Sequence, residues 1–163
     1  MPDDAHTPPR RSVLFVCTGN TCRSPLAESI CKAELARRLA CRIEELEAKG
    51  FEIHSAGVLA MPGGPATPEA VEVARTYGAD LASHRSRPVN PEWLERATDV
   101  VAMTASHAAL LLMQYPNLGP EPRLLCGAND LPDPIGGTEE VYRACADAIR
   151  VHVDRHLNEW LKP

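Results

Sequence analysis

Four short segments of the chain have the apolar, β-forming composition of strands. The first, residues 13–16, is an unbroken apolar run, which is typical of a strand buried on both faces of a sheet. The second alternates apolar and polar residues, the third is again apolar, and the fourth is interpreted as an edge strand. The expected strands span residues 13–16, 51–54, 99–103 and 123–126.

Longer amphipathic stretches between these segments predict helices. Three of them open with a capping residue followed by proline, namely Ser24-Pro25, Thr67-Pro68 and Asn90-Pro91. Helix-forming residues continue after the first opening as far as Ala48, so this helix is expected to stop only at Lys49-Gly50. The expected helices span residues 25–48, 68–77, 91–96, 104–115 and 139–160.

Helical spacing also predicts which faces are buried. In the stretch 104–115, Ala109, Leu112 and Met113 are expected to face inward. The last helix is expected to bury Val141, Cys145, Ala148, Ile149, His152, Val153, His156, Leu157 and Trp160. Because strands and helices alternate, we predict an α/β fold with a parallel sheet and helices on both faces.

Length and charge limit the possible number of domains and the possible classes of function. The 163 residues suffice for one domain with its own core, and a formal net charge of −5 argues against a general nucleic-acid binder. Residues 1–11 are polar and proline-rich and are interpreted as a flexible extension before a domain spanning 12–163. The next apolar run is too short for a signal peptide or a membrane span, so a cytoplasmic protein with no membrane partner is expected.

The six cysteines are scattered, unlike those of a secreted disulfide scaffold. No CxxC or Cys/His spacing indicates zinc, and no metal or cofactor is expected. One cysteine nevertheless lies at a position that favours a reactive thiol, between a buried strand and the start of a helix. Cys17 directly follows the strand 13–16, and Arg23 comes six residues later, beside the predicted helix start.

The segment from Cys17 to Arg23 is interpreted as an anion-binding loop that contains a nucleophile. Free N–H groups and the dipole at a helix N-terminus attract anions, and a thiol placed there beside an arginine readily forms a nucleophilic thiolate. The Arg23 guanidinium can bind two phosphoryl oxygens, and the Ser24 hydroxyl can donate to Cys17. The residues that supply the other backbone N–H groups are Thr18, Gly19, Asn20, Thr21 and Cys22.

Phosphoryl transfer to Cys17 also requires a general acid for the leaving group. Asp133 lies between two prolines and precedes Gly136-Gly137, so its carboxylate can be held over the loop. Asp130 is the alternative acid, although no proline follows it. Without the Cys-x5-Arg loop, Asp133 would be interpreted as an ordinary turn residue.

These residues together resemble the low-molecular-weight protein-tyrosine-phosphatase family. The matching segments are 16–28, 55–57, His84 and 133–134, in the order of the family. The resemblance implies a single flavodoxin-like domain with a four-stranded parallel sheet. It also implies hydrolysis of phosphorylated proteins through a phosphocysteine, with Cys17 as nucleophile, Arg23 as phosphate clamp and Asp133 as general acid.

Further roles follow from the same resemblance. Asn20 would hold the loop in shape, with Ser55 and His84 as hydrogen-bonding supports. In this family a cysteine at the position of Cys22 can form a reversible disulfide that protects the nucleophile, here Cys17. A passive loop residue is the alternative interpretation of Cys22.

Two differences from the tyrosine phosphatases of this family indicate a subclass within it. Many tyrosine phosphatases of the family have Ile or Leu where this chain has Thr21, and aromatic residues where Ile135-Gly136-Gly137 follows the Asp-Pro pair. These residues, together with segments 56–68 and 102–104, resemble bacterial protein-arginine phosphatases. Thr21 and Ile135 are therefore expected to set selectivity, with phosphoarginine as the favoured substrate and phosphotyrosine as the alternative.

Two other functional classes are compatible with parts of this pattern. A thioredoxin-coupled arsenate reductase on the same fold relays electrons through two further cysteines in the middle of the chain, but residues 58–125 contain none. A catalytically inactive phosphate-binding module is disfavoured because Cys17, Arg23, Ser24 and Asp133 are all present.

Overall fold

The structure, a computed structural model, describes residues 10–163, so most of the predicted extension lies outside the described residues. Arg11 already belongs to the first strand, where its N–H donates to the carbonyl of Gly50 (2.9 Å). The elements of the described chain are β1 (Arg11–Cys17), α1 (Arg23–Arg38), the 3-10 helix η2 (Ile43–Glu45), β2 (Phe51–Gly57), α2 (Pro68–Arg75), α3 (Pro91–Arg96), β3 (Asp99–Ala102), α4 (Ala105–Gln114), β4 (Arg123–Leu124) and α5 (Glu139–Trp160).

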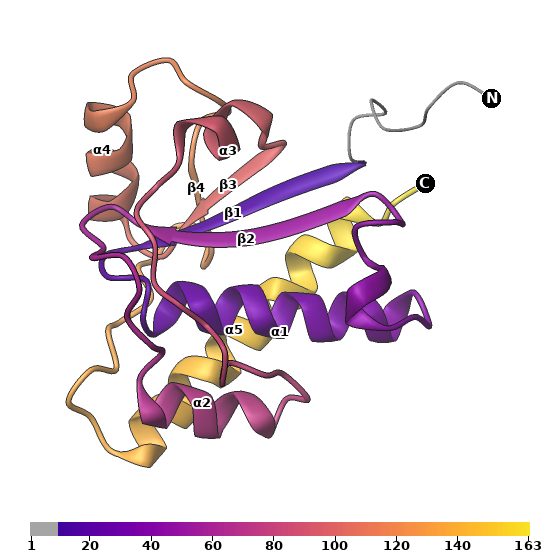
Figure 1. The fold of residues 1–163 in the computed structure, drawn as a ribbon, viewed down its shortest axis with the longest axis vertical. Coiled ribbons are helices and arrows are strands. Elements are labelled where there is room, and N and C mark those ends of the chain that lie inside the picture. The colour runs from indigo at the N-terminus through magenta and orange to yellow at the C-terminus, as the bar shows by residue number, and fades with distance from the viewer. Residues whose placement is uncertain (1–9) are drawn as a thin grey trace.

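The four strands form one parallel sheet in the order β2-β1-β3-β4. Helices α1, α2 and α5 cover one face of this sheet, and α3 and α4 cover the other (Figure 1). The predicted fold is therefore confirmed. Because all strands run the same way, their carboxyl ends lie along one edge, which is where such folds place ligands.

The position of β1 in the middle of the sheet explains why its residues are apolar. Val13 and Phe15 point into the larger core with α1, α2 and α5, whereas Leu14 and Val16 point into the smaller core with α3 and α4. All four side chains are essentially buried. A strand in the middle of a two-faced sheet has no solvent side, so it carries no alternation of polar residues.

Helix α1 ends at Arg38, so the predicted continuation to Ala48 is wrong. The N–H of Ala40 donates to Arg37 (3.2 Å) and that of Cys41 to Ala36 (3.0 Å), which closes the helix in a Schellman motif. Ala40 adopts the left-handed φ of 52° that glycine usually supplies at this position. The chain turns here because Leu46 must reach the core, where only 3% of it is exposed.

The expected inward face of α4 is also wrong. Ala109, Leu112 and Met113 are exposed, whereas His107 and Leu111 are buried. The helix is apolar around most of its circumference, so its own periodicity could not select a face. The face that is buried is the one that carries Leu111, which packs with Leu14 and Val16 of β1 in the smaller core. The helix is capped by the Thr104 hydroxyl, which accepts from the backbone N–H of His107 (3.2 Å).

In α5 the predicted inner face is correct from Cys145 onward except at His152, which is half-buried and lines a hollow beside β4. Val141 is exposed, and Tyr142 is buried in its place. Strand β2 runs past its expected end through Gly57, because Ser55 and Ala56 pair with Phe15 and Val16 of β1. Within residues 10–163, no helix is long and apolar enough to cross a membrane.

Candidate active site

The loop from Cys17 to Arg23 lies at the carboxyl end of β1 and leads directly into α1. The helix begins at Arg23, with Cys22 in the cap position and no side-chain cap. The expected role of Ser24 as a helix cap is therefore wrong. Its hydroxyl instead lies 2.9 Å from the sulfur of Cys17. Because a helix N-terminus without a side-chain cap keeps free N–H groups, the loop can bind an anion.

Asn20 is the centre of the hydrogen-bond network beneath the loop. It is fully buried and has a left-handed φ of 57°. Its amide nitrogen donates to Ser24 (2.8 Å) and Ser55 (2.9 Å), and its amide oxygen accepts from the N–H of Arg87 (3.0 Å). Asn20 occupies one lone pair of Ser24, and the Ser24 hydroxyl has two acceptors within reach, the Cys17 sulfur (2.9 Å) and, farther away, the Ala56 carbonyl (3.4 Å).

Ser55 and His84 support the loop from outside it. Ser55 donates to Glu28 of α1 (2.6 Å), and the Nε2–H of His84 donates to the carbonyl oxygen of Asn20 (2.8 Å). Burial lowers the pKa of His84, which favours the neutral ring. A side chain at Gly57 would collide with the Thr18 carbonyl, so glycine is needed where β2 passes the loop.

Arg23 connects the loop to the distant segment that carries Asp133. One of its Nη atoms donates to the carbonyl of Leu131 (2.9 Å), and the other lies 3.6 Å from Oδ2 of Asp133. Leu131 is itself held by its N–H, which donates to Met103 at the end of β3 (2.9 Å). The carboxylate of Asp133 is 45% exposed and also accepts from the N–H of Ile135 (3.1 Å).

Asp130, the alternative acid, has a different position. Its Oδ1 accepts from the N–H of Ala105 (2.8 Å), the first residue of α4. A carboxylate at a helix N-terminus satisfies a free N–H and interacts favourably with the dipole. Asp130 therefore has a structural explanation, and no ion pair joins it to Arg23 within the described residues.

The two expected selectivity residues lie on different segments. The Oγ1 atom of Thr21 would be 3.8 Å from a Cβ at Gly19, so its hydroxyl lies along the loop itself. The Thr21 carbonyl accepts from Thr67 (2.9 Å) and so ties the loop to the start of α2. Ile135 is 60% exposed, two residues after Asp133. One residue thus belongs to the loop and the other to the segment that carries Asp133.

Cys22 is buried near Cys17. Burial raises its pKa to about 12, and the nearby Cys145, Asp133 and Cys17 add to this shift. Cys22 is therefore a neutral thiol at neutral pH. All six cysteines have free thiols in this structure.

His107 also lies at this site, although the sequence did not predict it there. The Nε2 atom of His107, in the first turn of α4, lies 2.8 Å from Oγ1 of Thr18. The usable signal was its position just after β3, since neighbouring parallel strands end at the same edge. Among residues 10–163 no group of three or more His, Cys, Asp or Glu side chains is arranged to hold a metal ion.

Comparison with known proteins agrees with this geometry. Residues 12–162 match the family of low molecular weight phosphotyrosine protein phosphatases. The chain belongs to this family. A protein-arginine-phosphatase of Geobacillus stearothermophilus is 36% identical over 88% of this chain and 91% of its own length. Membership of this phosphatase family confirms the predicted fold and enzyme class.

Solved structures of phosphatases superpose closely. A low molecular weight protein tyrosine phosphatase from T. tengcongensis has a TM-score of 0.80 and 38% identity, covering 91% of this chain and 99% of its own. A cysteine-to-serine mutant of the YwlE arginine phosphatase, with a phosphorylated active-site serine, has a TM-score of 0.80 and 33% identity, covering 92% and 95%. Relatives named for both substrates are thus similarly close to the chain.

Proposed function

We propose that this family member is a protein-arginine phosphatase in which Cys17, Arg23 and Asp133 carry the reaction. The thiolate of Cys17 attacks the phosphorus atom, and the bond between phosphorus and the guanidino nitrogen breaks. The backbone N–H groups of the loop and Arg23 hold the phosphoryl oxygens. Asp133 donates its proton to the departing nitrogen, which leaves a phosphocysteine and a neutral guanidine that takes up a further proton from water.

The second step regenerates the enzyme. Asp133, now a carboxylate, takes a proton from a water molecule that attacks the phosphocysteine. The sulfur of Cys17 leaves as a thiolate, stabilised by the hydroxyl of Ser24 at 2.9 Å, and inorganic phosphate is released. The phosphorylated serine in the YwlE mutant supports this scheme, because there the residue replacing cysteine carries the phosphate.

The observation that carries the substrate assignment is Thr21. Its hydroxyl lies along the phosphate-binding loop, where it can hydrogen-bond a polar guanidino group or a water molecule. An Ile or Leu at this position presents only apolar surface, which suits an aromatic ring. Ile135-Gly136-Gly137 after the acid supplies no aromatic partner for a phenol, which supports the same assignment.

A protein-tyrosine phosphatase with the same mechanism is the second candidate. The observation in its favour is the 38% identity to a structure named for that activity. The two functions differ in the leaving group alone, so the residues at the rim of the loop decide between them.

A side-by-side assay separates these candidates. Hydrolysis of phosphoarginine and phosphotyrosine peptides of matched sequence is measured for the wild type, for Thr21→Ile and for Cys17→Ser. We expect the wild type to prefer phosphoarginine, Thr21→Ile to lower that preference by about tenfold or more, and Cys17→Ser to be inactive on both. A wild type that prefers phosphotyrosine, with an unchanged ratio in Thr21→Ile, contradicts the assignment.

We further propose that Cys22 protects the nucleophile. When peroxide converts Cys17 to a sulfenic acid, the Cys22 thiol can attack that sulfur, forming a disulfide and releasing water. Cys22→Ser should then lose activity irreversibly in peroxide, whereas the wild type recovers with dithiothreitol. Equal recovery of both proteins contradicts this role.

The natural substrates are proposed to be phosphorylated proteins in the cytoplasm. The scattered cysteines, unlike those of a secreted disulfide scaffold, support a reducing compartment. Ser55 and His84 are proposed to keep the loop in its anion-binding shape through their contacts with Asn20.

A further inference from the structure

His107 is a buried histidine whose position the reaction above does not explain. Only 4% of it is exposed, and its Nε2 atom lies 2.8 Å from Oγ1 of Thr18. Thr18 follows the nucleophile directly and is exposed at the mouth of the loop. Within residues 10–163, Nδ1 of His107 is the one buried side-chain nitrogen or oxygen that has no hydrogen-bond partner.

This missing partner determines which nitrogen carries the proton. Burial, reinforced by Arg23, lowers the pKa of His107 to about 4, whereas Asp130 and Asp133 oppose this shift. The ring is therefore neutral at neutral pH and has a single N–H group. A buried N–H without an acceptor is rarer and more costly than an unused lone pair. The proton consequently belongs on Nε2, which donates to Thr18.

The consequence for Thr18 is specific. Its hydroxyl accepts one hydrogen bond from His107, which fixes the side chain at the mouth of the loop. Its own O–H proton and its second lone pair remain available to a substrate. A threonine without this partner could rotate and would have to be ordered when the substrate binds.

The first turn of α4, which carries His107, is held at two points. The hydroxyl of Thr104 accepts from the backbone N–H of His107 (3.2 Å), and Asp130 accepts from the backbone N–H of Ala105 (2.8 Å). These contacts fix the backbone of His107, and burial restricts its ring. Because Thr18 is exposed, the histidine is the more rigid partner of this pair.

We propose that His107 is a positioning residue that orients the Thr18 hydroxyl to contact the substrate atoms next to the phosphorus. The role rests on the proposed phosphatase reaction but not on the choice of phosphoarginine. It adds to the loop a polar contact that the backbone N–H groups do not supply. The contact is made through Thr18, so His107 itself need not touch the substrate.

A double-mutant cycle tests this role on phosphoarginine peptide and on p-nitrophenyl phosphate. We expect His107→Leu and Thr18→Val each to lower kcat/KM by about 3- to 10-fold on both substrates. The double variant should lose no more than either single variant, because one contact is removed in all three. His107→Gln should recover most of the activity, since its side-chain amide can still donate to Thr18.

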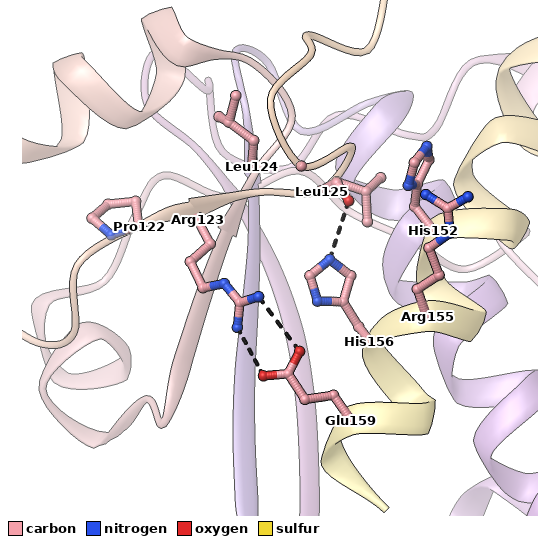
Figure 2. Close-up of a pocket in the computed structure, with 9 residues that line it drawn as sticks. Pro122, Arg123, Leu124, Leu125, His152, Arg155, His156 and Glu159 are labelled. Atoms are coloured by element: carbon pink, nitrogen blue, oxygen red, sulfur yellow. Dashed lines mark hydrogen bonds and ion pairs between the residues drawn. The ribbon is translucent and has the colours of Figure 1, made fainter.

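His156 provides a matched control. It is a similarly buried histidine, and its Nε2–H donates to the carbonyl of Leu125 (3.1 Å) (Figure 2). It lines a hollow between β4 and α5 to which no residue of the phosphate-binding loop contributes. His156→Leu should therefore lower the melting temperature and leave kcat/KM of the folded enzyme unchanged.

The outcomes separate the two proposals. Wild-type turnover of p-nitrophenyl phosphate without turnover of phosphoarginine overturns the arginine assignment, and the cycle on p-nitrophenyl phosphate still tests His107. Normal activity of Thr18→Val, which changes an exposed residue and should fold, overturns the positioning role. Losses that multiply in the double variant, or a His107→Gln as impaired as His107→Leu, also overturn it.

Discussion

An Nη atom of Arg23 lies 3.6 Å from the Oδ2 atom of Asp133, although the two residues come from opposite ends of the chain. The other Nη atom donates to Leu131, two residues before Asp133. The guanidinium that is proposed to bind the phosphoryl group thus also holds the segment that carries Asp133, the proposed acid. Loss of Arg23 would therefore weaken phosphoryl binding and also release the segment that carries Asp133.

The first prediction concerns this acid. Asp133→Asn cannot protonate a leaving group, so we expect kcat/KM for phosphoarginine, which reports formation of the phosphocysteine, to fall about 100-fold or more. The loss in kcat/KM should be much smaller for p-nitrophenyl phosphate, because p-nitrophenolate leaves readily without a proton, whereas kcat should fall on both substrates because hydrolysis of the phosphocysteine also uses Asp133. Steady-state kinetics on both substrates measures the difference.

Asp130→Asn is the control for this substitution. It removes the charge at the N-terminus of α4 and should cost about 0.5 to 1 kcal/mol of stability, with little effect on kcat. If Asp130→Asn shows the strong leaving-group dependence and Asp133→Asn does not, the two carboxylates have been assigned the wrong way round.

The second prediction concerns Asn20. Asn20→Ala removes two buried hydrogen bonds and one partly buried one and retains the left-handed backbone, so we expect a loss of about 2 to 4 kcal/mol of stability. Asn20→Gly should lose about 1 kcal/mol less, because glycine tolerates the φ of 57°. Urea unfolding measures both.

Asn117 is the control for Asn20, because it has the same left-handed backbone but lies outside the hydrogen-bond network beneath the loop. It has a φ of 63° and is exposed. Asn117→Ala should cost only about 1 kcal/mol. Equal losses at the two positions would mean that the bonds made by Asn20 add nothing to stability.

A third prediction uses the end of α1. Ala40 has a φ of 52° at the position where glycine is usual, so Ala40→Gly should stabilise the protein by about 1 kcal/mol. Ala33→Gly, in the interior of the same helix, should destabilise it by a similar amount. We expect the melting temperature to rise in Ala40→Gly and to fall in Ala33→Gly. A melting temperature of Ala40→Gly below that of the wild type would contradict backbone strain at Ala40.

A fourth prediction concerns pH. Hydrogen bonds from Arg37 are the largest cause that lowers the pKa of Glu34 to about 2, and Arg150 of α5 lies 3.2 Å from the same carboxylate. Because this pKa is lower in the folded state, the stabilisation is present above about pH 4.5 and is lost as the pH falls towards 2. We expect Glu34→Gln to cost about 1 to 2 kcal/mol at pH 7 and much less near pH 2.

The partly exposed pair of Glu72 and Arg75 is the comparison for Glu34. Its side chains are 70% and 64% exposed, so Glu72→Gln should change stability by less than about 0.5 kcal/mol at any pH. A stability difference between wild type and Glu34→Gln that stays constant from pH 7 to pH 2 would rule out the depressed pKa.

The phosphate-binding loop could be predicted because its chemistry is contiguous in the chain. Cys17, Arg23 and the apolar strand before them lie within a few residues of each other. Ser24 was misassigned since a serine before a proline is typical of a helix cap. The other contact predicted for Ser24, a hydrogen bond to Cys17, agrees with the 2.9 Å between its hydroxyl oxygen and the sulfur.

Contacts made across the fold were harder to predict. His107 looks like any polar residue of a helix, and only the adjacency of β1 and β3 brings it to Thr18. The end of α1 carries no glycine, so a closure made by backbone hydrogen bonds at Ala40 left no sign in the sequence. The face of α4 was ambiguous because apolar residues surround that helix.

The middle position of β1 has a consequence for how the enzyme loses activity. Its residues pair with β2 along the whole strand and with β3 from Val13 to Val16, and the carbonyl of Cys17 accepts from Val58 (2.9 Å). The floor of the loop cannot separate from its neighbours unless the sheet is pulled apart on both sides. In rising urea, catalysis and the fluorescence signal of the folded state should therefore disappear together, in one transition.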